Sequence, residues 1–156
     1  MSLENQITHY LESIPEPKCS EMKQLHALFL EWIPNCKLWF ESGIDANNKV
    51  VSNPNIGYGN FNISYANGTT REFYQIGLSA NTTGISVYIM GIRNKIDLVK
   101  LIGPTIGKAK VTGYCIKFKT IKDIDLIILR EAILLGTIVP NLHSQFSQIM
   151  DLHIVI

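Results

Sequence analysis

The side chains that could bind a ligand are concentrated in one basic stretch of the sequence. Residues 93–122 contain eight basic residues and a single acid, Asp97, so this stretch carries +7 while the rest of the chain carries −6. Such a local excess attracts anions, nucleotides or a nucleic-acid backbone. We therefore expect a small anionic ligand near Lys108, Lys110 and Lys117. Solvated lysines on an ordinary half-exposed strand are the simpler alternative.

Nucleic acid is a less favoured partner than a small anion. The formal net charge of the whole chain is only +1, from 14 basic and 13 acidic residues. A global charge this small gives no general attraction to a polyanion. The basic stretch at residues 93–122 nevertheless keeps nucleic acid open as an alternative.

Carboxylates near the N-terminus give a second candidate site, for a metal ion. Glu12 and Glu16 lie in a region where acids outnumber bases. Their spacing matches no recognised set of metal ligands, and charged side chains are mostly solvated in any protein. We therefore expect no cofactor, and iron held by Glu12 and Glu16 is the alternative.

The sequence shows no signature of catalysis. Cys115 has no general base near it in the sequence, and no Ser-His-Asp arrangement can be assigned. The segment 103–108, Gly-Pro-Thr-Ile-Gly-Lys, has one residue too few between its glycines to be a phosphate-binding loop, and Ala109 replaces the required Ser or Thr. We therefore favour a non-enzymatic binding or interaction module, with a small enzyme of unrecognised site as a further alternative.

Hydrophobic periodicity and turn residues predict the elements that position these side chains. Apolar residues at helical spacing predict two helices before residue 34, whereas alternation predicts strands through the middle of the chain. Asn67-Gly68 is a strong hairpin signal between two of them. The predicted helices span residues 3–14, 20–33, 94–102, 123–135 and 142–150, and the predicted strands span residues 37–40, 57–65, 72–79, 85–90 and 114–118.

This order predicts an α+β fold in which an antiparallel meander packs against N- and C-terminal helices. A length of 156 residues fits a single domain, residues 1–156. Aromatic residues on the predicted strands can line a pocket on the open side of the sheet. We expect the contact region to combine Tyr58, Tyr65 and Tyr88 with the three lysines named above.

Cysteine usage and the N-terminus indicate a cytoplasmic protein. There are three cysteines, without a Cys-x-x-Cys pair, which favours reduced thiols. The first residues lack the pattern of a secretory signal, and the least charged stretch, residues 132–150, contains too many polar residues for a membrane span. The apolar tail, residues 152–156, predicts self-association into a homo-oligomer.

Several motifs occur together in the middle of the chain. The segments NIGYGNFNISYANG, IGLS, GISVYIMG and IGKAKVTGYCIKFKTIKDIDL, in that order, resemble the YdhG-like family, a domain of unknown function. The resemblance covers about residues 38–135 and leaves residues 137–156 as an extra C-terminal segment. Phe73 stands where the family usually has a tryptophan, and the loop at residues 41–54 is longer than usual.

The resemblance implies an antiparallel sheet backed by helices. Some relatives are regarded as frataxin-like iron chaperones, so the resemblance also supports the iron-binding alternative with Glu12 and Glu16. It implies no particular ligand for the basic stretch.

Overall fold

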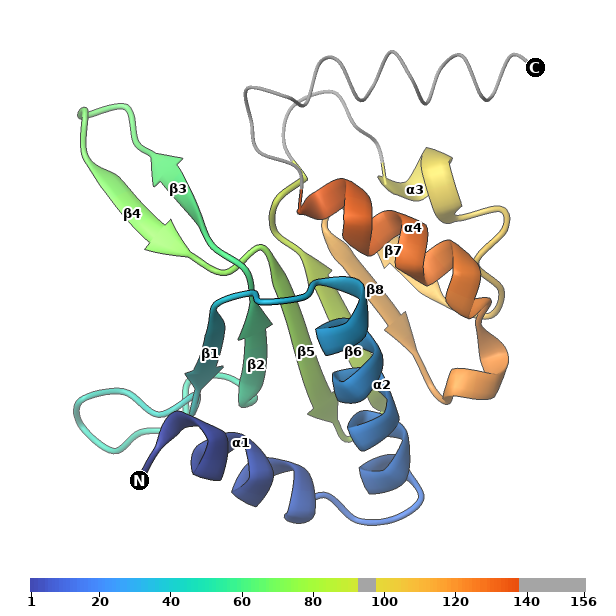
Figure 1. Ribbon diagram of the computed structural model, residues 1–156, viewed down its shortest axis with the longest axis horizontal. Coiled ribbons are helices and arrows are strands. Elements are labelled where there is room, and N and C mark those ends of the chain that lie inside the picture. Colours follow the sequence, from blue (N-terminus) through green and yellow to red (C-terminus); the bar gives the residue numbers. More distant parts are fainter. Residues whose placement is uncertain (93–97, 138–156) are drawn as a thin grey trace.

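The structure, a computed structural model, describes residues 1–92 and 98–137 of the chain. Helices at both ends and antiparallel strands between them confirm the predicted α+β class (Figure 1). The helices are α1 (Leu3–Glu12), α2 (Lys18–Trp32), α3 (Leu98–Ile102), η1 (Ile121–Asp123), a 3₁₀ turn, and α4 (Leu126–Gly136). The strands are β1 (Leu38–Glu41), β2 (Asn55–Tyr58), β3 (Phe61–Ser64), β4 (Thr70–Phe73), β5 (Ile76–Asn81), β6 (Gly84–Ile89), β7 (Lys110–Thr112) and β8 (Cys115–Phe118).

Six of these strands form one antiparallel sheet in the order β1-β2-β5-β6-β8-β7. Strands β3 and β4 pair only with each other, and their hairpin extends away from the main sheet in Figure 1. The six-stranded sheet positions the basic stretch, because β7 and β8 form its last two strands.

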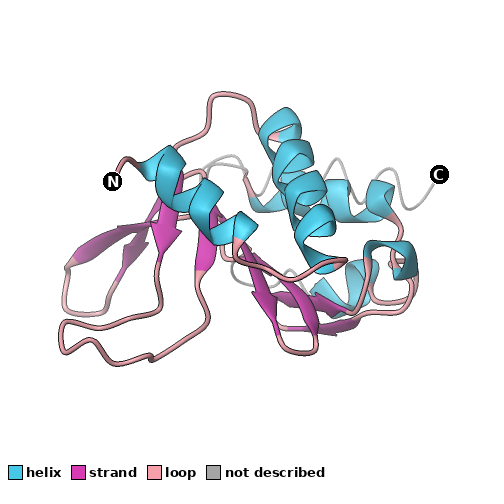
Figure 2. Ribbon diagram, turned by 90° about the horizontal axis from the view of Figure 1, so that it is seen from below, coloured by secondary structure: helices cyan, strands magenta, loops and turns pink. Residues whose placement is uncertain are grey.

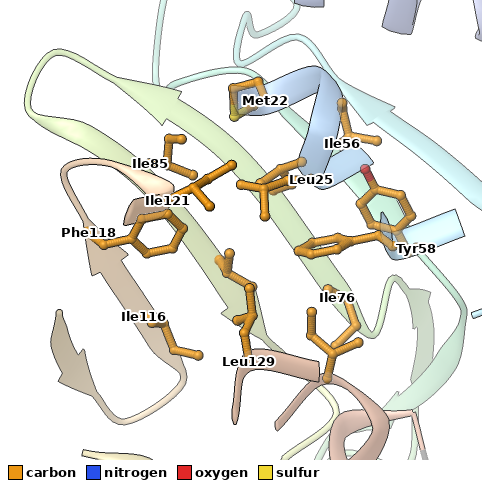
Figure 3. Close-up of a cluster of buried hydrophobic side chains, with 14 of the residues drawn as sticks. Met22, Leu25, Ile56, Tyr58, Ile76, Ile85, Ile116, Phe118, Ile121 and Leu129 are labelled. Atoms are coloured by element: carbon orange, nitrogen blue, oxygen red, sulfur yellow. The ribbon is translucent and has the colours of Figure 1, made fainter. Parts of the chain in front are cut away.

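The helices cover one face of the sheet. Figure 2 shows α1, α2 and α4 on the same side of the strands. The fully buried side chains of Ile56, Leu78, Val87 and Ile116 face one another across four strands and point into this helical layer. Met22 and Leu25 of α2 and Leu129 of α4 complete the same core, as Figure 3 shows. Because side chains alternate along a strand, the residues between these core positions lie on the opposite face.

The predicted strand 57–65 is divided at Gly59, where the buried side chains change from even-numbered to odd-numbered positions. In β2 the buried positions are Ile56 and Tyr58, whereas in β3 they are the odd-numbered Phe61 and the partly buried Ile63. Gly59 has φ +79°, a left-handed conformation that favours glycine, and it ends β2. The chain then leaves the sheet for the β3–β4 hairpin and returns in β5, which pairs with β2. The predicted strand 72–79 is divided for the same reason.

Helices α4 and α2 differ in how their first turns are capped. Asp125 caps α4, and its Oδ1 accepts hydrogen bonds from the backbone N–H of Ile127 and Ile128. The second helix was predicted over residues 20–33, but α2 begins two residues earlier, at Lys18, without a side-chain cap. The Ser20 hydroxyl instead lies 2.8 Å from Oε2 of Glu16.

Two predictions fall outside the described residues, the helix at 142–150 and the self-associating tail at 152–156, as do the first residues of the helix predicted over 94–102. Among the residues that are described, no helix is both long and apolar enough to cross a membrane.

Candidate functional site: the open face of the sheet

The face of the sheet opposite the helices carries two of the three predicted lysines, Lys110 and Lys117, and we call it the open face. On its half formed by β6, β8 and β7 the side chains are those of Ser86, Tyr88, Cys115, Lys117, Lys110 and Thr112. None of these six residues is acidic. Two of the eight basic residues of the stretch 93–122 therefore lie together on this half of the face.

Lys110 and Lys117 lie directly opposite each other in the register of β7 and β8, and both are exposed. Directly opposite residues have Cβ atoms about 5 Å apart, so the two lysine side chains leave the sheet side by side. Across the described ranges 1–92 and 98–137, the one ion pair is Lys37–Glu72. Lys37 directly precedes β1, which is the edge strand at the far end of the sheet from β7. Neither Lys110 nor Lys117 therefore has a counter-charge in the described chain.

Two tyrosine rings lie beside this lysine pair. Tyr88 is half-buried on β6, opposite Cys115 of β8. Tyr114 belongs to the two-residue turn between β7 and β8, and 53% of its surface is exposed. The two ring centroids are 6.3 Å apart and the planes are tilted by 42°. Burial raises the pKa of the Tyr88 hydroxyl, and nearby Cys115 adds to the rise.

Small polar groups form the floor between the lysines and the tyrosines. Ser86 is fully buried, lies opposite Lys117 in the register, and accepts a hydrogen bond of 3.0 Å from Nδ2 of Asn81. Cys115 is partly exposed beside it. Burial raises the pKa of the Cys115 thiol, although Lys117 and Ser86 oppose the rise. The thiol is therefore protonated at neutral pH, which makes it a poor nucleophile.

The other half of the open face is covered by aromatic side chains. Tyr74 lies across the backbone of Gly57 and Gly77, where a Cβ atom would come within 3 Å of its ring. Phe73 packs on Tyr74 with ring centroids 4.2 Å apart. Burial raises the pKa of the Tyr74 hydroxyl to about 12. Tyr74 and its two glycines therefore separate a closed half of the face from the half that carries the lysines.

Comparison of the chain with family models, with curated proteins and with solved structures finds no match. The chemistry of this face must therefore be inferred from its own residues.

The structure brings together three of the six predicted ligand-binding residues, Tyr88, Lys110 and Lys117. Tyr65 lies on the β3–β4 hairpin, outside the six-stranded sheet. Lys108 is exposed in the segment before β7, where its backbone N–H donates to the carbonyl of Asp123.

The placement of Tyr58 on the contact face was wrong. Tyr58 shares the helix-covered face with Ile56 and has no exposed surface. Its hydroxyl lies 2.6 Å from Nδ1 of His26 on α2. The cause is the phase change at Gly59, which puts Tyr58 and Tyr88 on opposite faces of the sheet. Tyr58 is therefore a core residue and cannot contact a ligand on the open face.

Tyr114 and Ser86 were not predicted as site residues. Tyr114 was expected in the strand that contains Ile116, but the strand begins at Cys115. Gly113 directly before it was the available signal, because glycine is common in tight turns. Ser86 carried no signal, since a serine within an apolar strand is ordinary.

The two carboxylates of the metal-site alternative are both exposed. Glu16 accepts hydrogen bonds from Ser20, and this interaction lowers the pKa of its carboxyl. Glu12 is the last residue of α1. No group of three or more His, Cys, Asp or Glu side chains in the described part of the chain is arranged to hold a metal ion.

Proposed function

We propose that this protein is a non-enzymatic binding module that holds a small anionic ligand between Lys110 and Lys117 on the open face. The observation that carries the proposal is the direct opposition of these two lysines without a counter-charge in the described chain. Directly opposed like charges destabilise a strand pair, whereas an opposite-charge pair at such positions contributes roughly 0.2–1 kcal/mol. An anion between the lysines replaces this repulsion by two attractive interactions.

The surroundings of the pair support an anion rather than a cation or an apolar ligand. The open-face positions of β6, β8 and β7 include no acid that would compete for the lysines. Both lysines are exposed, so a ligand reaches them without any movement of the backbone. The raised pKa of Cys115, the thiol nearest to the pair in the register, supports binding over covalent catalysis.

The proposal is tested with Lys117→Gln, because it predicts opposite effects on stability and on binding. Removal of one charge relieves the repulsion, so the free energy of unfolding in ligand-free buffer rises slightly, by up to about 1 kcal/mol. The same change weakens binding of inorganic phosphate, measured by calorimetry at low ionic strength. Lys23→Gln, at an exposed position of α2, is the matched control and changes neither quantity.

Added salt gives a second readout of the same proposal. Because the lysines are exposed, a rise in ionic strength from about 10 mM to 1 M shortens the screening length from about 30 Å to 3 Å and weakens phosphate binding. The proposal fails if neither phosphate nor sulfate binds to the native chain at low salt. It also fails if Lys23→Gln and Lys117→Gln weaken binding equally.

Family and location belong to the same proposal. Membership of the YdhG-like family is supported by the motifs over about residues 38–135 and by an α+β fold of the kind that the family implies. A cytoplasmic location is supported by three cysteines that form no disulfide, Cys19, Cys36 and Cys115. A fluorescent fusion of the full chain, expressed in cells and fractionated, tests the location.

A further inference from the structure

The open face offers an aromatic slot as well as a pair of charges. We propose that the anion is part of a nucleotide, a ligand of the nucleoside monophosphate class, whose base enters between Tyr88 and Tyr114 while its phosphate lies between Lys110 and Lys117. This inference rests on the proposed function and adds to it the chemical class of the ligand.

The separation of the two tyrosine rings fits a base after a small adjustment. Carbon atoms pack at about 3.5–4.0 Å, so a base stacked between two tyrosine rings needs twice that distance, about 7–8 Å, from one tyrosine ring to the other. The centroids of Tyr88 and Tyr114 are 6.3 Å apart and their planes are tilted by 42°, so the slot must widen by about 1 Å and the planes must turn towards parallel. Tyr114 can supply this movement, because it lies in a tight turn and is more than half exposed.

The distance from the slot to the lysines fits one sugar. Tyr88 lies opposite Cys115, and Lys117 follows Cys115 by two residues on the same face of β8. Two residues of a strand span about 6.7 Å, so the lysine pair lies one side-chain row away from the tyrosine row. A ribose separates base and phosphate in a nucleotide in the same way. The exposed hydroxyl of Thr112, opposite Cys115, lies in the tyrosine row and can bond to the edge of the base.

The rest of the open face favours a single nucleotide over a nucleic-acid strand. Proteins that bind single strands stack successive bases on successive aromatic rings. Here the ammonium of Lys37 lies 4.4 Å from the centroid of the Trp39 ring, and the Arg71 guanidinium lies 5.1 Å from that of Phe73. Phe73 also packs on Tyr74. These rings are therefore occupied by the protein's own side chains, and Tyr88 and Tyr114 provide a platform for one base.

Four probes separate the contributions of base and phosphate: adenosine monophosphate, adenosine, inorganic phosphate and a series of oligoadenylates. We expect the full chain to bind adenosine monophosphate at least about tenfold more tightly than phosphate or adenosine, which corresponds to about 1.4 kcal/mol. Tyr114→Leu removes this advantage and leaves phosphate binding intact. Lys117→Gln weakens both phosphate and nucleotide. Tyr65→Leu, at a similarly exposed tyrosine outside the main sheet, changes neither.

Cys115 locates the bound ligand independently of affinity. Its thiol is partly exposed beside Tyr88, whereas Cys36 precedes β1, the edge strand farthest from the lysine pair. Saturating adenosine monophosphate is expected to slow maleimide alkylation of Cys115 severalfold, as measured by peptide mass spectrometry. The rate at Cys36 stays constant and is the internal control. Equal protection of both thiols would contradict a site on this face.

The outcomes distinguish the two proposals. If phosphate and adenosine monophosphate bind equally well and Tyr114→Leu has no effect, the anion site stands and the nucleotide inference is overturned. If none of the four probes binds, both fail. If affinity for oligoadenylates rises steeply with length, the ligand is a nucleic-acid strand and the single-nucleotide assignment is wrong.

Discussion

Replacement of Gly57 by alanine tests the arrangement that separates the two halves of the open face. Gly57 lies on β2, and its φ is outside the left-handed region, so its backbone accepts a side chain. The obstacle is steric. A Cβ atom at this position would lie 2.7 Å from Cγ and Cδ1 of Tyr74 and 2.8 Å from Cβ of Trp39. Cβ of Trp39 is fixed by its own backbone, and the buried Tyr74 ring can move away only if it loses its packing against Phe73.

The expected magnitude follows from two opposing effects. Alanine in place of glycine reduces the entropy of the unfolded chain, which stabilises a compatible site by about 0.4–1 kcal/mol. Carbon atoms forced to 2.7 Å lie about 1 Å inside their optimal separation, and overpacking of this kind costs about 1–3 kcal/mol. The steric cost is the larger effect. We therefore expect Gly57→Ala to lower the free energy of unfolding by about 1–2 kcal/mol.

Urea unfolding at constant slope measures this change, and Gly113→Ala is its matched control. Gly113 also lies outside the left-handed region, but a Cβ there would meet no atom within 4 Å. The same substitution should thus leave stability unchanged or raise it by up to about 1 kcal/mol. A Tyr74→Ala background removes the contacts with the ring and leaves the contact with Cβ of Trp39, so Gly57→Ala should cost about 1 kcal/mol less there without becoming neutral. If Gly57→Ala is as stable as the native chain, or its cost is the same in both backgrounds, Tyr74 does not lie across the sheet as described.

Three further predictions concern the helix-covered side. Tyr58→Phe removes the buried hydroxyl that lies 2.6 Å from Nδ1 of His26, and should lower the free energy of unfolding by about 1 kcal/mol, whereas Tyr65→Phe on the exposed hairpin should not. Burial lowers the pKa of His26, so the folded chain binds this proton more weakly than the unfolded chain does. Its contribution to stability is therefore complete above about pH 6.5 and declines as the pH falls from there towards the lowered pKa. The decline should be smaller in His26→Gln, as measured by urea unfolding at a series of pH values, and an unchanged decline would contradict the assignment. Asp125→Ala removes the cap of α4 and should cost about 1 kcal/mol, whereas Asp125→Asn, which keeps an acceptor oxygen, should cost much less.

The fold class was predictable because burial constrains one face of nearly every element. The apolar periodicity of α1, α2 and α4 and the alternation in β6 and β8 record which side chains contact the core. The phase change at Gly59 was harder to recognise. The apolar residues shift from even positions, Ile56 and Tyr58, to odd positions from Phe61 onwards, but the stretch is short, and the strand pairing shows that it belongs to two strands. Because the shift at Gly59 was missed, Tyr58 was predicted on the wrong face of the sheet.

Only the segment that carries the candidate site was predictable, because the pairing of its strands is not visible in the sequence. The charge count identified the segment that contains Lys110 and Lys117, and the alternation in β8 placed Lys117 away from the core. That the two lysines are direct neighbours depends on the register of β7 with β8, which is set by the two-residue turn between them. The position of Tyr114 beside Tyr88 depends on the same turn. Contacts between strands require the register, and a count of charges does not contain it.

The two faces of the sheet differ in how well they obey the rules of folding, and this difference supports the assignment of function. On the helix-covered face the cross-strand neighbours are apolar and fully buried, so each contact there favours the native fold. On the open face, two like charges oppose each other and a large aromatic ring is exposed in a tight turn. The opposed charges do not stabilise the sheet, and a chain selected for stability alone would replace one of the two lysines. Local departures from folding rules concentrate at functional sites. Because Lys110, Lys117 and Tyr114 meet around one hairpin, a single ligand that is both anionic and planar accounts for all three.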